Sequence, residues 1–248
     1  MTRDIDVMLD LMDITFQDFE RSTPTKPKFI EMSFGHVYRF EEQDINQAMI
    51  QKLARVQSLV RAAQLLHYNG FVQEQTILHR TIDETNEDIM FLVYAVTNDT
   101  ITDLHERFLE AFWEEEIDES GTIMDSQQKR PMILRKKINS YLAKIGGVEL
   151  DPSTQQKVVR SISKAYSGFV HGASPQIMEM YDGNPPHFHT KGMLGTSRME
   201  AHADDLWNYV YRSFISYIAV AKALGAEEHV EMLTNKLDEI GHSTGVRN

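Results

Sequence analysis

The stretch SKAYSGFVHGASP contains a histidine, His171, whose neighbours could give it a chemical role. On a helix that turns by about 100° per residue, His171 shares one face with Arg160, Lys164 and Ser167. The apolar side chains of the same helix fall on the opposite face. An imidazole beside a cation and a hydroxyl can move a proton and stabilise a negative charge. His171, Lys164 and Ser167 are therefore candidate catalytic residues, although the same histidine also stands where the helix would end.

Arg80 and Glu84 form a second pair of interest, within the apolar stretch LHRTIDETNEDIMFLVYA. Their (i, i+4) spacing places them on one helix face as an ion pair. On a solvated face such a pair stabilises the helix only slightly. If it is buried, it fixes the register of the helix or forms a polar centre. With both alternatives open, Arg80 and Glu84 are candidate binding residues.

Arg212 belongs to a narrow polar stripe on the otherwise apolar segment 199–224. In so apolar a helix, polar side chains must face solvent, another polar helix or a ligand. We therefore include Arg212 among the candidate binding residues. The stripe consists of His202, Asp205, Arg212, Ser213 and Ser216.

His187 and His189 stand two residues apart in the loop YDGNPPHFHTKGMLG. A His-x-His pair can bind a divalent metal when a third ligand approaches. No HExxH motif, paired ExxH motif or cysteine set completes a recognised site, and we predict an exposed loop without a metal. A ferritin-like di-iron bundle is disfavoured for the same reason.

Apolar residues recur at helical spacing through most of the chain, which predicts an all-α protein. We expect an antiparallel bundle of about six to eight helices, with no recognisable strand alternation. Residues 1–42 are predicted to form an N-terminal helix and an irregular segment, 43–240 the helical-bundle domain, and 241–248 a flexible tail. Within the bundle, helices are expected over about 43–68, 71–96, 103–116, 131–145, 153–171 and 199–224, followed by a short final helix.

The composition limits the classes of function. No cysteine is present, which excludes a disulfide framework and a thiolate metal site. No apolar run is long enough to span a membrane, and the acidic N-terminus does not look like a secretory signal. We expect a soluble cytoplasmic protein. Glycine-rich phosphate loops and the G-x-S-x-G motif are absent, and no cofactor is predicted.

Charge is distributed unevenly along the chain. The net charge is −12, which argues against broad nonspecific binding to nucleic acid. Residues 80–119 nevertheless contain thirteen acidic and two basic residues, and residues 129–164 contain nine basic and two acidic residues. Either the two blocks are neighbouring helix faces that attract each other, or the basic block meets a phosphate-bearing partner. Arg160 lies in the basic block and is a candidate binding residue, about 16 Å along the helix from His171.

Two of these stretches, AYSGFVHGAS and LHRTIDE, resemble motifs of HEPN-type helical bundles. The likeness is to a poorly characterised bacterial branch and covers roughly residues 50–220, although only the two short stretches are specific. It implies an HEPN-like core with an N-terminal helical addition, often as a homodimer. It also implies a role in phage defence, toxin–antitoxin pairs or RNA handling, with RNA or a nucleotide-bearing molecule as partner. Some such proteins work beside a nucleotidyltransferase.

Catalytic HEPN proteins cleave RNA with an arginine placed a few residues before the histidine. This chain has Lys164 at the nearest such position, with six residues between it and His171. Lysine offers a positive charge to a phosphate but lacks the bidentate fork of arginine. The resemblance therefore favours a noncatalytic binding or scaffold module. Two alternatives stay open: a metal-independent ribonuclease that uses His171 with Lys164 and Ser167, and a small-molecule or peptide sensor.

Overall fold

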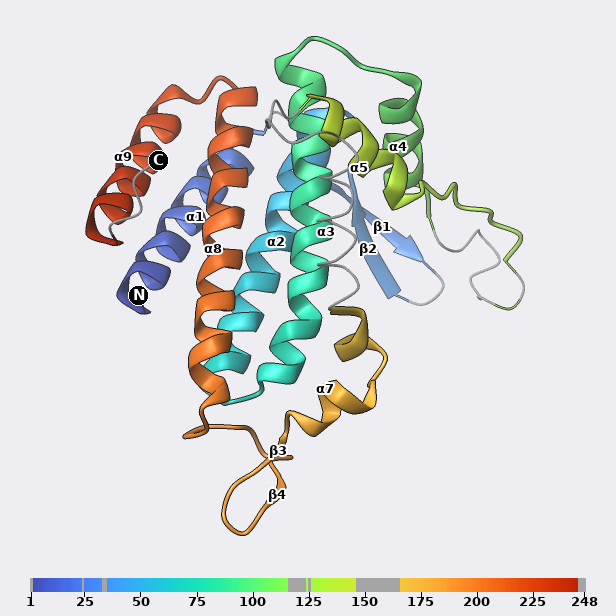
Figure 1. Cartoon of the computed structure of the whole chain (residues 1–248). Coiled ribbons are helices and arrows are strands. Elements are labelled where there is room, and N and C mark those ends of the chain that lie inside the picture. Colours follow the sequence, from blue (N-terminus) through green and yellow to red (C-terminus); the bar gives the residue numbers. More distant parts are fainter. Residues whose placement is uncertain are drawn as a thin grey trace.

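The computed structural model describes residues 2–23, 25–32, 35–115, 124, 126–145 and 166–244. These residues are mostly helical, with two small antiparallel strand pairs, which confirms the predicted all-α class (Figure 1). No helix among them is both long enough and apolar enough to cross a membrane.

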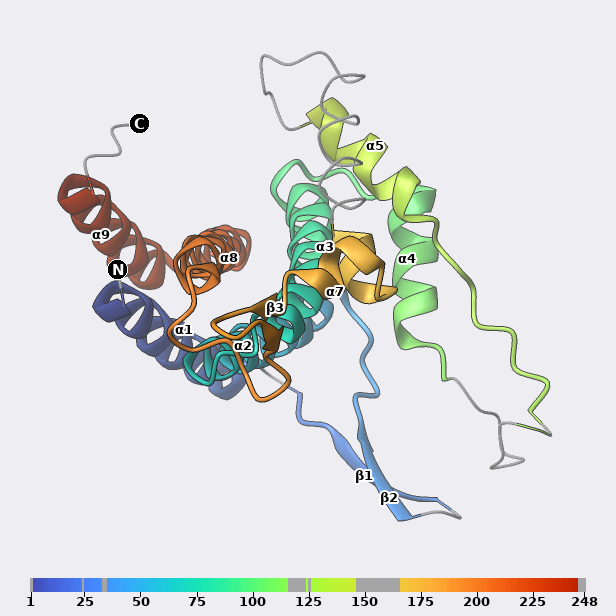
Figure 2. The same cartoon turned by 60° about the horizontal axis from the view of Figure 1, so that its bottom comes forward.

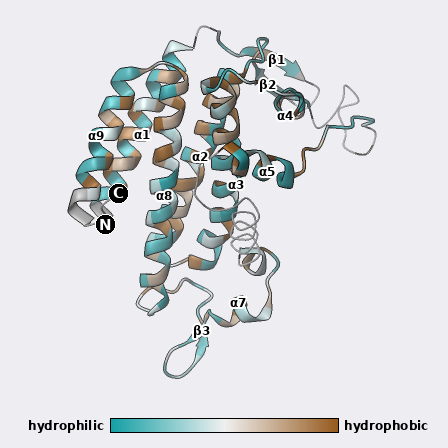
Figure 3. Cartoon of the chain, turned by 45° about the horizontal axis from the view of Figure 1, so that its top comes forward, coloured by the Kyte–Doolittle hydropathy of each residue, from teal (hydrophilic) through white to brown (hydrophobic). Residues whose placement is uncertain are grey.

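Four long helices lie side by side and form the bundle: α1 (Thr2–Ser22), α2 (Ile45–Tyr68), α3 (Val72–Thr97) and α8 (Arg198–Ala223). The last three begin and end within a few residues of the predicted helices. Asp44 caps α2 by accepting the backbone N–H of Gln47 at 2.8 Å, and Asn69 ends it. Hydrophilic residues lie on the outer faces of these helices (Figure 3).

The direction of the helices differs in part from the predicted antiparallel bundle. Helix α2 runs antiparallel to α3, because a short turn at Asn69–Gly70 joins them. Helices α3 and α8 run parallel, since Thr76 contacts His202 and Asn86 contacts Ser213. A parallel pair needs a long crossover, and the whole segment between Thr97 and Arg198 provides it.

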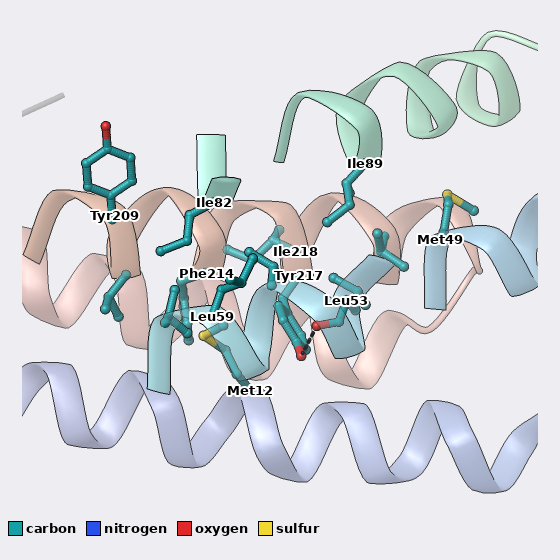
Figure 4. Close-up of a cluster of buried hydrophobic side chains, with 14 of the residues drawn as sticks. Met12, Met49, Leu53, Leu59, Ile82, Ile89, Tyr209, Phe214, Tyr217 and Ile218 are labelled. Carbon is teal, nitrogen blue, oxygen red and sulfur yellow. Dashed lines mark hydrogen bonds between the residues drawn. The ribbon is translucent and has the colours of Figure 1, made fainter. Parts of the chain in front are cut away.

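Helix α1 packs within the bundle core, although the sequence suggests an addition to it. Its buried side chains include Met8, Leu9 and Met12, which belong to the same apolar cluster as α2, α3 and α8 (Figure 4). Tyr217 of α8 lies in this cluster, and its hydroxyl donates to Gln57 Oε1 at 3.1 Å. Helix α9 (Glu227–Thr244) packs on α8 and α1 and continues into the segment predicted as a tail.

The crossover between α3 and α8 contains the less regular elements. Helix α4 (Asp103–Trp113) begins with a capping box at Thr102, and α5 (Arg135–Ile145) begins four residues later than Pro131, its predicted start. A helical turn at 166–170 precedes α7 (Ser174–Met178). The hairpin β3 (Tyr181–Asp182) and β4 (His187–Phe188) follows. Most of the predicted helix 153–171 lies outside the described residues.

The antiparallel strand pair 28–32 and 35–39, here called the hairpin, lies in a stretch that is predicted to be irregular. Strands β1 (Lys28–Met32) and β2 (Gly35–Arg39) pair with Phe29 opposite Tyr38, and their rings are 5.7 Å apart. The hairpin projects away from the bundle (Figure 2). Each strand has five residues and neither covers a core, so the alternation is too short to stand out in the sequence.

Two glycines before α8 allow a test of how the α2–α3 turn packs. Gly192 and Gly195 both have positive φ, +100° and +80°. A Cβ on Gly192 would lie 2.4 Å from the carbonyl oxygen of Asn69, whereas nothing lies within 4 Å of a Cβ on Gly195.

We expect Gly192→Ala to lower the free energy of unfolding by about 2 kcal/mol more than Gly195→Ala. Both variants bear the backbone cost of a positive φ, but only the first forces the turn at Asn69 to move. Urea unfolding followed by circular dichroism measures the difference. Equal losses in the two variants would contradict the described packing.

Candidate functional site

His171 lies at the surface, directly after the helical turn 166–170. Its side chain is exposed, and its backbone N–H donates to the carbonyl of Ser167 at 3.0 Å. Ser167 is half-buried. Lys164 and Arg160 lie outside the described residues, so the proposed grouping of His171 with Lys164 stays a prediction.

Arg80 and Glu84 form the ion pair that their spacing predicts. The Arg80 Nε and Glu84 Oε1 atoms are 3.3 Å apart, and the two side chains are 35% and 41% exposed. This partial exposure fits a helix ion pair at the surface better than a buried polar centre. Such a pair contributes about 0.5 kcal/mol or less to stability.

Arg212 contacts a buried acid, Asp83 of α3, through an ion pair. Tyr209, one turn earlier on α8, donates its hydroxyl to the other oxygen of Asp83 at 3.0 Å. Burial raises the pKa of the Asp83 carboxyl, and the Arg212 guanidinium opposes that shift. The guanidinium also lies 5.6 Å from the centre of the Tyr209 ring. The Arg212 side chain is 46% exposed, so one side of it faces solvent.

His79 is fully buried next to this pair. Its ring stacks on Tyr209, with centroids 4.0 Å apart, and the edge of Tyr166 approaches from the 166–170 turn. Burial lowers the pKa of His79 to about 3, and nearby His202 and His67 add to the effect. The imidazole is therefore neutral at physiological pH. Its Nδ1 atom has no hydrogen-bond partner among the described residues.

These residues belong to a continuous polar seam between α3 and α8. Asn86 donates to Ser213 at 3.1 Å and accepts from Ser216 at 2.8 Å, both fully within the interior. The predicted polar stripe of α8 thus faces another polar helix, which was one of its three expected environments. Because Asn86, Ser213 and Ser216 each have a defined hydrogen-bond partner, this part of the seam fixes the parallel register of the two helices.

Asp88 forms a second buried polar centre, on another face of α3. Its carboxylate accepts from Lys52 of α2 at 2.7 Å and from Arg135 of α5 at 2.5 Å. Its side chain is only 6% exposed. Arg135 also lies 3.7 Å from Glu87, and burial raises the pKa of that carboxyl to about 7. The acidic block and the basic block of the sequence therefore attract each other at Arg135.

Four lysines of the segment 126–145 take no part in this centre. The segment contains six basic residues and no acidic residue. We name the exposed members the basic strip: Lys129, Arg130, Lys136, Lys137 and Lys144. The four lysines of the strip form no ion pair with any residue that the structure describes. The strip therefore presents concentrated positive charge on a protein that is acidic as a whole.

A pocket of about 400 Å³ is lined by side chains of α4, of α5 and of residues 130–133, together with Lys52 of α2 and Asp88 of α3. Its walls are mainly apolar, and the charged residues Lys52, Asp88, Arg130 and Arg135 also line it. No pattern in the sequence predicts this pocket, because its lining comes from distant stretches of the chain. The apolar lining residues are Phe108, Ala111, Phe112, Pro131, Met132, Ile133 and Ile138.

The residues that the structure describes bring no third metal ligand to the His187–His189 pair. The two rings are 4.5 Å apart, and His187 Nδ1 is 3.0 Å from the carbonyl oxygen of Pro185. Across the described ranges, no cluster of three or more histidine or acidic side chains is arranged to hold a metal ion. His187 is exposed in the hairpin, whereas His189 is partly buried and its Nε2 atom has no hydrogen-bond partner among the described residues.

The neutral His79 predicts how stability depends on pH. The pKa of His79 is near 6.5 in the unfolded chain and about 3 in the folded protein. Below about pH 6.5 the unfolded chain therefore takes up a proton that the folded protein does not, and the free energy of unfolding decreases as the pH falls toward 3. At pH 5 the loss is roughly 2 kcal/mol. His79→Phe keeps a ring on Tyr209 but cannot take up a proton. The decrease in unfolding free energy between pH 7 and pH 5 should therefore be smaller in this variant by about that amount.

Urea unfolding at the two pH values measures the effect. His171→Phe replaces an exposed histidine and serves as the control. We expect its unfolding free energy to decrease between pH 7 and pH 5 as much as that of wild type. An equally large decrease in wild type and His79→Phe would show that His79 is not held neutral in the fold.

Comparison with known proteins identifies no family for this chain. No protein-family model matches the sequence, and no curated protein or solved structure matches it significantly. The function must therefore be argued from the residues and their geometry.

Proposed function

We propose that this protein is a noncatalytic HEPN-like helical-bundle protein that binds RNA through the basic strip. The supporting observation is the segment 126–145, which has six basic and no acidic residues in a chain of net charge −12. The phosphate backbone of RNA supplies most of the affinity of nonspecific protein–RNA contacts, and it requires such a local concentration of cations. The net charge of the whole protein then limits binding elsewhere on its surface.

The arrangement of α5 supports this proposal. Its first residue, Arg135, faces inward to Asp88, whereas Lys136, Lys137 and Lys144 are exposed. Lys137 and Lys144 are separated by about two turns, so their charges extend along the helix by roughly 10 Å. A row of cations of this kind can follow an extended backbone of single-stranded RNA.

RNA cleavage is the second candidate function. The observation in its favour is the exposed side chain of His171, because a general base for an external substrate must be reachable. This proposal also needs a cation near His171, and Lys164 is the residue that the resemblance suggests. A homodimer and a nucleotidyltransferase partner are further proposals that depend on the resemblance alone.

We expect the double variant Lys136→Glu, Lys137→Glu to bind short single-stranded RNA about tenfold more weakly than wild type at low salt, with a shallower salt dependence. Two phosphate contacts are lost and two repulsions are added. Fluorescence anisotropy of a labelled oligouridine measures the affinity. The control is Lys191→Glu, Arg198→Glu, which reverses two exposed charges near the other end of the bundle. Equal affinities of the two double variants would contradict a role for the basic strip.

The same RNA separates binding from cleavage. Incubation of wild type with the RNA should leave it intact, as should His171→Ala. Cleavage by wild type that is lost in His171→Ala would replace the binding proposal with the ribonuclease.

A further inference from the structure

The open pocket between α4 and α5 combines apolar walls with charges of mainly one sign. Its volume of about 400 Å³ lies within the range of small-molecule sites. Three cations, Lys52, Arg130 and Arg135, line it together with one acid, Asp88. Cations therefore outnumber acids in the lining, and Arg135 also lies 3.7 Å from the carboxylate of Glu87 outside it.

Lys52 is held in a defined position inside this pocket. Its ammonium donates to Asp88 at 2.7 Å and lies 5.2 Å and 5.6 Å from the ring centres of Phe112 and Phe108. Asp88 is shared with Arg135, which is also anchored to the backbone carbonyl of Glu84 at 3.2 Å. Two cationic groups are thus fixed before any ligand arrives, which lowers the entropic cost of binding an anion.

The apolar walls of the pocket indicate which kind of ligand body would bind beside an anionic head group. Phe108 and Phe112 stand one turn apart on α4, and Met132 and Ile133 lie in the segment that precedes α5. Aromatic and aliphatic walls favour an apolar body. A cationic ligand would be repelled by three lining residues, and inorganic phosphate alone would leave the apolar walls without contacts.

We infer that this pocket binds a small amphiphilic anion, with a carboxylate or phosphate head group toward Lys52 and Arg135 and an apolar, ring-sized body against Phe108 and Phe112. This site is distinct from the proposed RNA-binding surface. The two share Arg130, but Lys136 and Lys137 do not line the pocket. The protein would then combine a surface for a polyanion with an open pocket for a small molecule.

A pair of matched fluorescent probes tests the inference. 1-Anilinonaphthalene-8-sulfonate has an aromatic body and an anionic group, and N-phenyl-1-naphthylamine has nearly the same body without the charge. We expect saturable binding of the anionic probe, about tenfold tighter than that of the neutral probe. Benzoate and phenyl phosphate should displace it and reveal which head group is preferred. Equal affinity for the two probes, or displacement by inorganic phosphate alone, would overturn the inference.

Two kinds of variant locate the probe. Ala111→Phe places a ring inside the pocket and should abolish binding of the anionic probe, with circular dichroism and urea unfolding confirming that the variant folds. Arg130→Gln should weaken binding about fivefold, whereas its exposed neighbour Lys129 does not line the pocket, so Lys129→Gln should leave binding unchanged. The double variant Lys136→Glu, Lys137→Glu should weaken the binding of RNA but leave the binding of the anionic probe unchanged. Unchanged probe binding in both Ala111→Phe and Arg130→Gln would overturn the assignment.

Discussion

The buried carboxylate of Asp88 organises the side of the molecule on which both proposed functions lie. An ionised acid in the interior is stable only when cations and hydrogen bonds compensate for the water that it loses. Lys52 of α2 and Arg135 of α5 provide this compensation, at 2.7 Å and 2.5 Å. The result is that the first residue of α5 is tied to the bundle, which α5 also contacts through the buried side chain of Ile138 and through the ring of Tyr141 against Phe91. As a consequence, the exposed lysines of α5 face outward. Lys52, Asp88 and Arg135 also supply charged groups to the lining of the pocket.

Helix α3 connects this centre to the rest of the fold. One face carries Asp88, and another carries the polar seam with α8, in which Asp83 and Asn86 have partners on the neighbouring helix. Apolar side chains of the same helix, such as Ile82 and Ile89, fill the core (Figure 4). A helix with polar contacts on two faces can pack in only one register, because any shift would leave several buried groups without partners. The seam thus positions α3, and α3 positions Asp88.

Local patterns in the sequence were sufficient to predict the long helices. Continuous apolar periodicity predicts α2, α3 and α8, and Asn69–Gly70 correctly marks the end of α2. The polar stripe on α8 was correctly expected to need a polar environment, because an unpaired polar group in an apolar helix is costly. The helix that provides this polar environment is determined by the path of the chain between α3 and α8, which the local pattern does not predict. The parallel arrangement of α3 and α8 is not a property of either segment alone.

The charged centre at Asp88 and the pocket could not be predicted either, because their residues come from distant parts of the sequence. Lys52 and Arg135 are separated from Asp88 by 36 and 47 residues, and no spacing rule connects them. In the sequence, Asp88 is one of thirteen acids in a block, and Arg135 is one of nine basic residues. Opposite charges predict attraction between the two blocks, but no spacing selects the pair that forms. The motif around His171 is more conspicuous in the sequence, yet His171 lies exposed beyond a helical turn.

The dependence of α5 on Asp88 can be measured directly by hydrogen exchange. Asp88→Asn keeps the size of the side chain but removes the charge that holds Lys52 and Arg135. The backbone amides of α5 should then exchange at least about tenfold faster, whereas those of α8 keep their protection. Glu84→Gln removes a partly exposed acid from the same helix and should leave α5 as in wild type. Unchanged protection of α5 in Asp88→Asn would contradict the account, because α5 would then be held by contacts that do not involve this carboxylate.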